Sequence, residues 1–202
     1  DLRRGKPTNH KRFGECTATL AGDALQAAAF ETILTAPLPA EVNVAAGLTL
    51  ARGAGALGMC GGQQLDMEGE TRIFTLKEVA RMNQLKTGCL LNTACVMGVL
   101  AAGVAMDDPM AAAAERYAKA IGLAFQVRDG MLNVTSTEEE MGKPVGNDAE
   151  SHKSTYVSLL GLDKCASVIV QQTAAAKDAI RGCLPDTDFL CDLADYLAGR
   201  EK

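Results

Sequence analysis

Apolar residues recur at helical spacing along most of the chain. Six stretches carry apolar side chains three or four positions apart, which predicts six helices. These stretches cover residues 20–33, 42–57, 76–106, 111–132, 156–180 and 189–197. The 33 alanines favour the same structure, because alanine is the best helix former. Sustained alternation of apolar and polar β-branched residues does not occur, so the pattern predicts an all-α protein.

Capping residues lie where these helices should begin. Thr75 and Glu78 have the spacing of a capping box, and Asp108 precedes Pro109 as an N-cap precedes a proline at the first helical position. Pro185 introduces the last helix. The 202 residues suit one domain, which we expect to extend over residues 1–202.

Charge and cysteine content narrow the functional classes. The net charge of −5 makes nucleic acid an unexpected partner. Basic residues do cluster within residues 3–12; this segment could be a nucleic-acid arm, but a solvated segment or an anion site fits an acidic protein better. Seven cysteines without a C-x-x-C pair indicate neither disulfides nor a zinc site, and favour a reducing cytoplasm. Residues 88–106 carry no charge, yet Asn92 and internal glycines favour a buried helix over membrane insertion.

Two further motifs predict no site. Residues 53–58 fit G-x-G-x-x-G, but no strand precedes them, so close helix packing at small residues is the better interpretation. His10 and His152 are the only histidines, too few and too far apart to predict a histidine-based site.

Carboxylate and lysine side chains gather towards the end of the helix predicted at 111–132. Gln126, Asp129 and Asn133 share one face of it. Lys143 follows in a Gly-Lys-Pro-Val-Gly loop, and Lys153 opens the next helix. Acids that hold hard cations beside lysines that hold phosphate suit a metal–diphosphate complex. An ordinary solvent-facing helix end is the alternative.

A second basic position lies inside the long helix predicted at 76–106. In Lys86-Thr87-Gly88 the glycine costs about 1 kcal/mol relative to alanine. That cost indicates close packing or a bent backbone, which could turn a carbonyl and the Thr87 hydroxyl towards a cavity. A solvated lysine followed by a packing glycine is the alternative.

Several of these motifs together, in this order, resemble the trans-isoprenyl diphosphate synthases. The resemblance is carried by Asp-Leu-Arg-Arg-Gly-Lys-Pro-Thr at 1–8, Gly-Gly-Gln-Gln-Leu-Asp at 61–66, Lys-Thr-Gly at 86–88, and the segments 125–133, 142–148, 153–160 and 193–202. It extends over essentially all 202 residues and is nearest to the bacterial farnesyl diphosphate synthases, or geranyltranstransferases. It implies an isoprenoid synthase-type helical bundle around a central cavity, a cytoplasmic homodimer, and three Mg²⁺ ions, with Mn²⁺ as a substitute.

The resemblance also implies roles for cationic residues. Arg3 would face the allylic diphosphate and Arg4 the isopentenyl diphosphate. Lys86, Lys143 and Lys153 would neutralise the allylic diphosphate.

Polar residues receive roles by the same resemblance. Gln63 and Asp66 match a pair on the cavity wall near the allylic substrate. Thr87 and Gln126, with Lys86, match the groups beside the reacting carbons. Asp129 matches the first aspartate of the second metal-binding motif.

Two departures from the family pattern affect these expectations. The second motif is usually Asp-Asp-x-x-Asp, whereas this chain has Asp129-Gly130-Met131-Leu132-Asn133, so Asn133 offers only a neutral oxygen. Lost negative charge should weaken a hard-cation site. The chain also starts at the tail of the first motif, so we expect it to be the C-terminal portion of a polyprenyl synthetase domain, inactive by itself.

The resemblance implies condensation of isopentenyl diphosphate with dimethylallyl or geranyl diphosphate to a product such as farnesyl diphosphate. Ionisation would precede condensation and proton loss. The degenerate second motif leaves a binding or regulatory subunit of the same fold as the alternative. A terpene-cyclase-like enzyme is a third hypothesis, disfavoured by the arginine pair at 3–4 and by Lys143 and Lys153.

Overall fold

The described residues fold mainly into helices. The computed structural model describes residues 1–3, 5–135 and 153–200. Its elements in chain order are β1 (Leu2–Arg3), β2 (Lys6–Pro7), α1 (Asn9–Phe13), α2 (Glu15–Leu34), α3 (Ala40–Ala54), α4 (Met59–Glu68), α5 (Leu76–Asn83), η1 (Gln84–Gly88), α6 (Cys89–Ala101), α7 (Pro109–Thr135), α10 (Tyr156–Leu160), α11 (Leu162–Ile180) and α12 (Asp188–Gly199). The predicted all-α class is confirmed, since β1 and β2 form only a short antiparallel hairpin.

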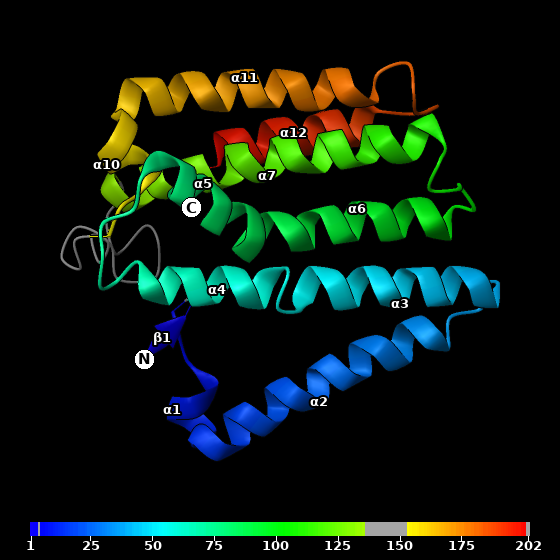
Figure 1. The fold of residues 1–202 in the computed structure, drawn as a ribbon, viewed down its shortest axis with the longest axis horizontal. Helices are drawn as coiled ribbons and strands as arrows, with labels where there is room; N and C mark the ends of the chain where they lie inside the picture. The colour runs from blue at the N-terminus through cyan, green and yellow to red at the C-terminus, as the bar shows by residue number, and fades with distance from the viewer. Residues whose placement is uncertain (4, 136–152, 201–202) are drawn as a thin grey trace.

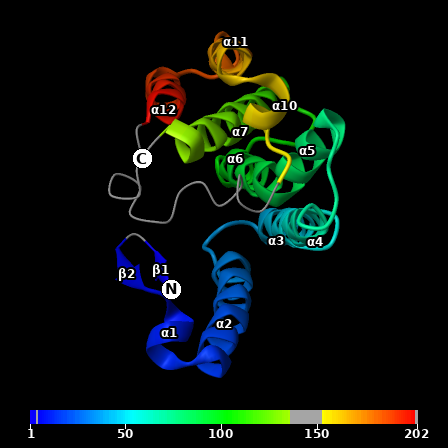
Figure 2. The same ribbon diagram turned by 90° about the vertical axis from the view of Figure 1, so that its left-hand side faces the viewer.

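Successive helices lie side by side in chain order. Figure 1 shows α2, then α3 with α4, then α6, α7 and α11 across the molecule, with α12 beside α7 and α11. Figure 2 gives the same arrangement from one end, with the β hairpin beside α2. Short connections between neighbouring helices explain this order.

One well-buried part of the core lies between α7, α11 and α12. Tyr117 and Ala120 of α7 pack against Ala176 and Ile180 of α11. The Tyr117 hydroxyl donates to the Leu190 carbonyl at 2.7 Å, and burial, with smaller effects of neighbouring cysteines, raises the pKa of Tyr117 to about 12. A buried tyrosine hydroxyl needs such a partner, and here it ties α12 to α7.

The helix predicted at 76–106 differs from the prediction in two respects. It ends at Ala101, because Gly103 then turns the chain with φ 77°. Its middle, Gln84–Gly88, is a π-helix in which the Cys89 N–H bonds to the Gln84 carbonyl. The expectation of a bent backbone at Lys86-Thr87-Gly88 is therefore confirmed, and a wide turn of this kind is frequent at functional sites.

The helix predicted at 156–180 is interrupted. Gly161, with φ 80°, separates α10 from α11. Apolar periodicity continues across this point, so the pattern alone did not show the break.

The G-x-G-x-x-G segment forms the turn between α3 and α4, as close-packing residues. A Cβ on Gly53 would lie 2.0 Å from Thr93 Oγ1 of α6, and one on Gly58 would lie 2.1 Å from the Gly53 carbonyl oxygen. The packing interpretation is confirmed. The structure adds α4, which was not predicted.

The predicted helix starts are also confirmed. Thr75 and Glu78 form both hydrogen bonds of the capping box at α5. Asp108 accepts from the Met110 N–H at 2.7 Å, with Pro109 opening α7.

Helix α2 is the least covered of the long helices. It has no buried residue, and Leu20 and Leu25 are 60% and 70% exposed. By length and composition alone, one helical stretch of the described residues, Ala40–Glu68, would be apolar enough to cross a membrane. One such stretch is weak evidence, and the turn at residues 55–58 would leave backbone groups unsatisfied in lipid.

Candidate functional site

Three side chains from distant segments converge at one end of α4. Asp66 accepts from Lys86 Nζ of η1 at 2.7 Å and from Lys153 Nζ at 3.4 Å. Lys153 also pairs with Glu70 at 3.0 Å. The side chains of Asp66 and Lys153 are only 17% and 20% exposed, so solvent screens these pairs less than surface ion pairs. We call Asp66, Lys86 and Lys153 the lysine–aspartate cluster.

The surroundings of Asp66 and Lys153 favour the ionised forms of both side chains. Burial by itself would raise the pKa of Asp66, but the hydrogen bond and charge of Lys86, together with Lys153, outweigh burial and lower the pKa. Burial opposes the charge of Lys153, yet Glu70 and Asp66 raise its pKa. Two cationic side chains are therefore fixed beside each other, an arrangement that can bind a diphosphate.

Lys86 is positioned by the π-helix and by a close approach of α4. A Cβ on Gly62 would lie 2.1 Å from the backbone nitrogen of Lys86 and 2.5 Å from its Cα. Only glycine permits this separation, which brings Asp66, one turn further along α4, within reach of Lys86.

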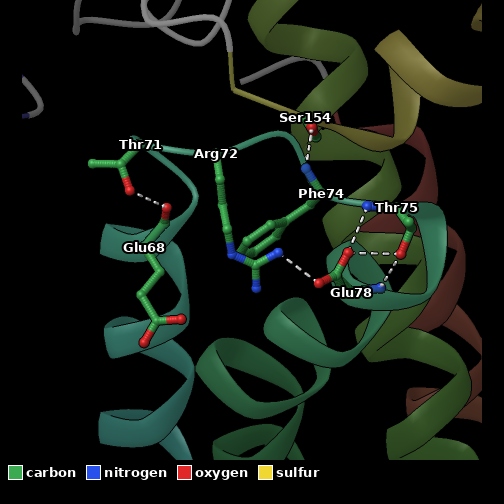
Figure 3. A network of polar contacts seen from close by, with 7 residues as sticks. All are labelled: Glu68, Thr71, Arg72, Phe74, Thr75, Glu78 and Ser154. Atoms are coloured by element: carbon green, nitrogen blue, oxygen red, sulfur yellow. Dashed lines mark hydrogen bonds and ion pairs between the residues drawn. The ribbon is translucent and has the colours of Figure 1, made fainter.

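Lys153 is positioned by its neighbour in sequence. The Ser154 hydroxyl oxygen accepts from the Phe74 N–H at 2.9 Å, as Figure 3 shows. The Phe74 side chain is 3% exposed and packs in a core cluster with Val79 and Tyr156. The segment before α10 is thus anchored to the loop that joins α4 to α5.

That loop is itself fixed by a polar network. Arg72 stacks on the Phe74 ring at 4.3 Å and donates to Glu78 at 2.7 Å (Figure 3). The backbone N–H of Thr75, with the Arg72 guanidinium, lowers the pKa of Glu78 to about 2. The network joins the helix cap to the loop that carries Phe74.

A cavity of about 630 Å³ lies between α3, η1, α6 and α7. The three residues of the lysine–aspartate cluster do not line it, but Gln84 and Gly88, at the two ends of the π-helix that carries Lys86, do. Gln126 lines it as well. Leu57, Val96 and Leu123 supply apolar lining. Such a volume lies within the range of small-molecule sites.

Among the described residues, Asp129 forms no ion pair with the lysine–aspartate cluster. Its Oδ1 instead accepts from Arg200 Nη2 at 2.9 Å. The guanidinium of Arg200 lies 4.0 Å from the centre of the Phe125 ring, and the Arg200 carbonyl accepts from Arg128 Nε at 2.9 Å.

The residues around Asp129 do not fit a divalent cation. Within the described ranges no group of three or more His, Cys, Asp or Glu side chains could hold a metal. Gly130 has no side chain, Asn133 has no charge, and Arg200 already neutralises Asp129. Magnesium favours carboxylate oxygens, and the described part of this site offers one.

The other predicted residues are distributed as follows. Gln63 lies exposed on α4, and Thr87 is half-buried in η1. Arg3 lies exposed on β1, and none of the ion pairs between described residues includes it. Arg4 and Lys143 lie outside the described residues.

Sequence reasoning missed four residues that act through these groups. Glu70, Phe74 and Ser154 position Lys153, and Arg200 pairs with Asp129. The segments 153–160 and 193–202 had been noted as motifs, but spacing gave no signal for the partners of individual side chains.

Comparison with known proteins identifies the family. The polyprenyl synthetase family model matches residues 1–183. The chain is 41% identical over 204 residues to farnesyl diphosphate synthase of Micrococcus luteus, and 41% identical over 212 residues to that of Escherichia coli; all of the chain and 69% of each relative are covered.

Solved structures give the same result for the fold. An FPP/GFPP synthase from Zymomonas mobilis superposes with a TM-score of 0.85 at 33% identity, covering 97% of this chain and 66% of that chain. A geranyltransferase from Helicobacter pylori, solved in complex with magnesium and isoprenyl diphosphate, gives 0.83 at 31% identity, covering 97% and 64%. The chain thus spans about two thirds of the length of these proteins. It belongs to the polyprenyl synthetase family, the trans-prenyltransferases.

Proposed function

We propose that the protein joins an allylic diphosphate to isopentenyl diphosphate and releases a short-chain prenyl diphosphate such as farnesyl diphosphate. The observation that carries this proposal is the lysine–aspartate cluster, in which Lys86 belongs to the same π-helix that lines the cavity through Gln84 and Gly88. Lys86 and Lys153 come from segments far apart in the chain and meet at Asp66, whose side chain is 17% exposed. Family membership supplies the reaction class.

The proposed chemistry begins with the two ammonium groups. Lys86 and Lys153 would bind the diphosphate oxygens of the allylic substrate, with Asp66 and Glu70 holding them in place. The carbon–oxygen bond breaks, its electron pair stays on the diphosphate, and the lysines stabilise that charge.

The carbon chain would then lie in the cavity. The double bond of isopentenyl diphosphate attacks the allylic cation, forming a carbon–carbon bond, and the released diphosphate takes the proton. Gln126, which lines the cavity, and the half-buried Thr87 would offer oxygens to the cation. Apolar walls at Val96 and Leu123 would exclude water.

Magnesium is the proposed cofactor of the complete protein, by analogy with the Helicobacter pylori relative. Because the residues around Asp129 do not fit it, no step above depends on a metal at that position. Three ions, and Mn²⁺ as a substitute, stay predictions.

The two alternative functions predict different results in an activity assay. A non-catalytic subunit would bind both substrates without turnover, and a cyclase would release a cyclic hydrocarbon from the allylic diphosphate alone. The degenerate motif at 129–133 motivated the first alternative, but relatives named as synthases do not favour it.

A single assay tests the proposal. The full-length protein is incubated with radiolabelled isopentenyl diphosphate, geranyl diphosphate and Mg²⁺, and the products are separated by chromatography. We expect labelled farnesyl diphosphate. Substrate binding without product, or a cyclic hydrocarbon, would contradict the proposal.

We further propose that the chain is part of one domain of a cytoplasmic homodimer, with no nucleic-acid partner and no membrane insertion. The exposed leucines of α2 support association, because large apolar patches mark interfaces. Analytical ultracentrifugation of the full-length protein would test the dimer.

A further inference from the structure

Arg200 is held against the end of α7 by three different contacts. Its Nη2 donates to Asp129 at 2.9 Å, its guanidinium stacks on Phe125 at 4.0 Å, and its carbonyl accepts from Arg128 at 2.9 Å. The Arg200 side chain is only 15% exposed, whereas Asp129 is 41% exposed. The arginine is thus the more deeply held member of the pair.

These contacts suit a planar cation. A guanidinium is delocalised and weakly hydrated, so it can lie on an aromatic face and donate to a carboxylate at the same time. Among the described residues its buried Nε has no hydrogen-bond partner, so Asp129 and Phe125 are the side chains that offset its desolvation.

The residues next to Asp129 in the motif supply no further negative charge to bind a divalent ion. With Gly130 and Asn133 in place of carboxylates, Asp129 carries the single negative charge of the motif, and Arg200 balances it. An incoming Mg²⁺ would meet a neutralised carboxylate and the repulsion of a fixed guanidinium. Expelling Arg200 would also break its contact with Phe125.

We propose that Arg200 takes the place of a divalent cation at Asp129, so that this carboxylate anchors the end of α12 to α7 and is not a metal ligand. The inference depends on the proposed function only in one respect, namely that Asp129 belongs to the expected metal-binding motif of that function. The experiments below measure metal binding and unfolding instead of prenyl transfer. The inference can therefore be wrong although the protein forms product, or correct although it forms none.

The first measurement counts bound Mn²⁺ by electron paramagnetic resonance, on the full-length protein with inorganic pyrophosphate as the probe. We expect wild type and Asp129→Asn to bind the same number of ions, with dissociation constants within about twofold. Loss of one ion, or weakening of about tenfold or more, would overturn the proposal. Asp195→Asn is the matched control, since Asp195 is also ion-paired, with Lys177 at 2.5 Å.

The second measurement is a double-mutant cycle in thermal unfolding. Asp129→Asn and Arg200→Gln should each lower Tm by about 2–4 °C, and the double variant should melt no lower than the worse single variant. This coupling should persist in millimolar Mg²⁺ with pyrophosphate. Fully additive effects, or coupling that Mg²⁺ abolishes, would show that the guanidinium does not hold the site.

Discussion

Asp66 and Asp129 are both aspartates of family motifs, and both accept hydrogen bonds from cationic side chains, but their surroundings differ. Asp66 is 17% exposed and lies between Lys86 and Lys153, whose ammonium groups keep further donors for a ligand. Asp129 is 41% exposed and meets one guanidinium, which is also stacked on an aromatic ring. In our proposals, the first carboxylate holds two cations for a substrate, and the second anchors the end of α12 to α7.

The two surroundings differ in how easily the present partner of the charged group can be replaced by a ligand. Glu70, which also pairs with Lys153, is 56% exposed, so an incoming diphosphate can replace it at low cost. Arg200 is enclosed by Phe125 and Asp129, and replacing it would break a buried contact. Similar charges at comparable distances therefore predict binding at one place and anchoring at the other.

The largest expected effect is at Lys153. Lys153→Met should lower kcat/KM for prenyl transfer by about 10²–10³, because it removes a fixed cation from the leaving diphosphate. The kcat/KM of Lys153→Arg should lie between those of wild type and Lys153→Met, because arginine keeps the positive charge but not the compact shape of an ammonium group. Steady-state kinetics with labelled isopentenyl diphosphate provide the measurement.

Lys164→Met is the control for this loss. Lys164 lies exposed on α11, in no ion pair with another described residue. If both methionine variants behave alike, the lysine–aspartate cluster is not the diphosphate site.

The second effect concerns the approach of α4 to η1. Gly62→Ala would place a Cβ 2.1 Å from the Lys86 backbone nitrogen, so the two elements must separate. We expect a loss of about 1–3 kcal/mol in the free energy of unfolding, measured in urea. Gly98→Ala, whose Cβ would meet nothing within 4 Å, should instead be neutral or stabilising by up to about 1 kcal/mol. Equal effects at both glycines would refute the close approach.

The third effect tests how α12, and with it Arg200, is held. Tyr117→Phe removes the hydrogen bond to the Leu190 carbonyl and should cost about 1 kcal/mol of unfolding free energy. Tyr196→Phe, at a side chain 70% exposed, should cost almost nothing. Unfolding in urea measures both variants. If Tyr117→Phe leaves the free energy of unfolding unchanged, this hydrogen bond does not fix α12.

The smallest effect is a change in pH dependence. The pKa of Asp66 is lowered in the folded protein, so its stabilising contribution is present above the unfolded carboxyl pKa and is lost as pH falls through the folded pKa. The difference in urea midpoint between wild type and Asp66→Asn should therefore shrink as pH falls from about 5 to about 2. A constant difference over that range would mean that Asp66 is not held ionised by the lysines.

Much of the fold follows from apolar periodicity, because each helix must bury one face. The predictions failed where backbone conformation decides: at Gly161, whose φ of 80° ends α10, and at Gly103, which ends the turn after α6. Periodicity is blind to a single residue in the left-handed region.

The sequence predicted those parts of the site in which residues of one motif contact residues of another motif. Asp66, Lys86 and Lys153 do so, since each was conspicuous as a charged residue in a family-like segment. Arg200 was not, because a pair between residues 71 positions apart depends on how α12 docks on α7. No local spacing encodes that docking.

The wide turn at Gln84–Gly88 holds more residues than an α-helical turn of the same height. Deleting one of them would let the helix close into regular winding, at little cost to its length. The flanking helices α5 and α6 would keep their register, because the wide turn accommodates its extra residue locally. Lys86, inside that turn, would change its direction relative to Asp66 while α5 and α6 stayed packed, so loss of a single codon would separate the two charges without unfolding the protein.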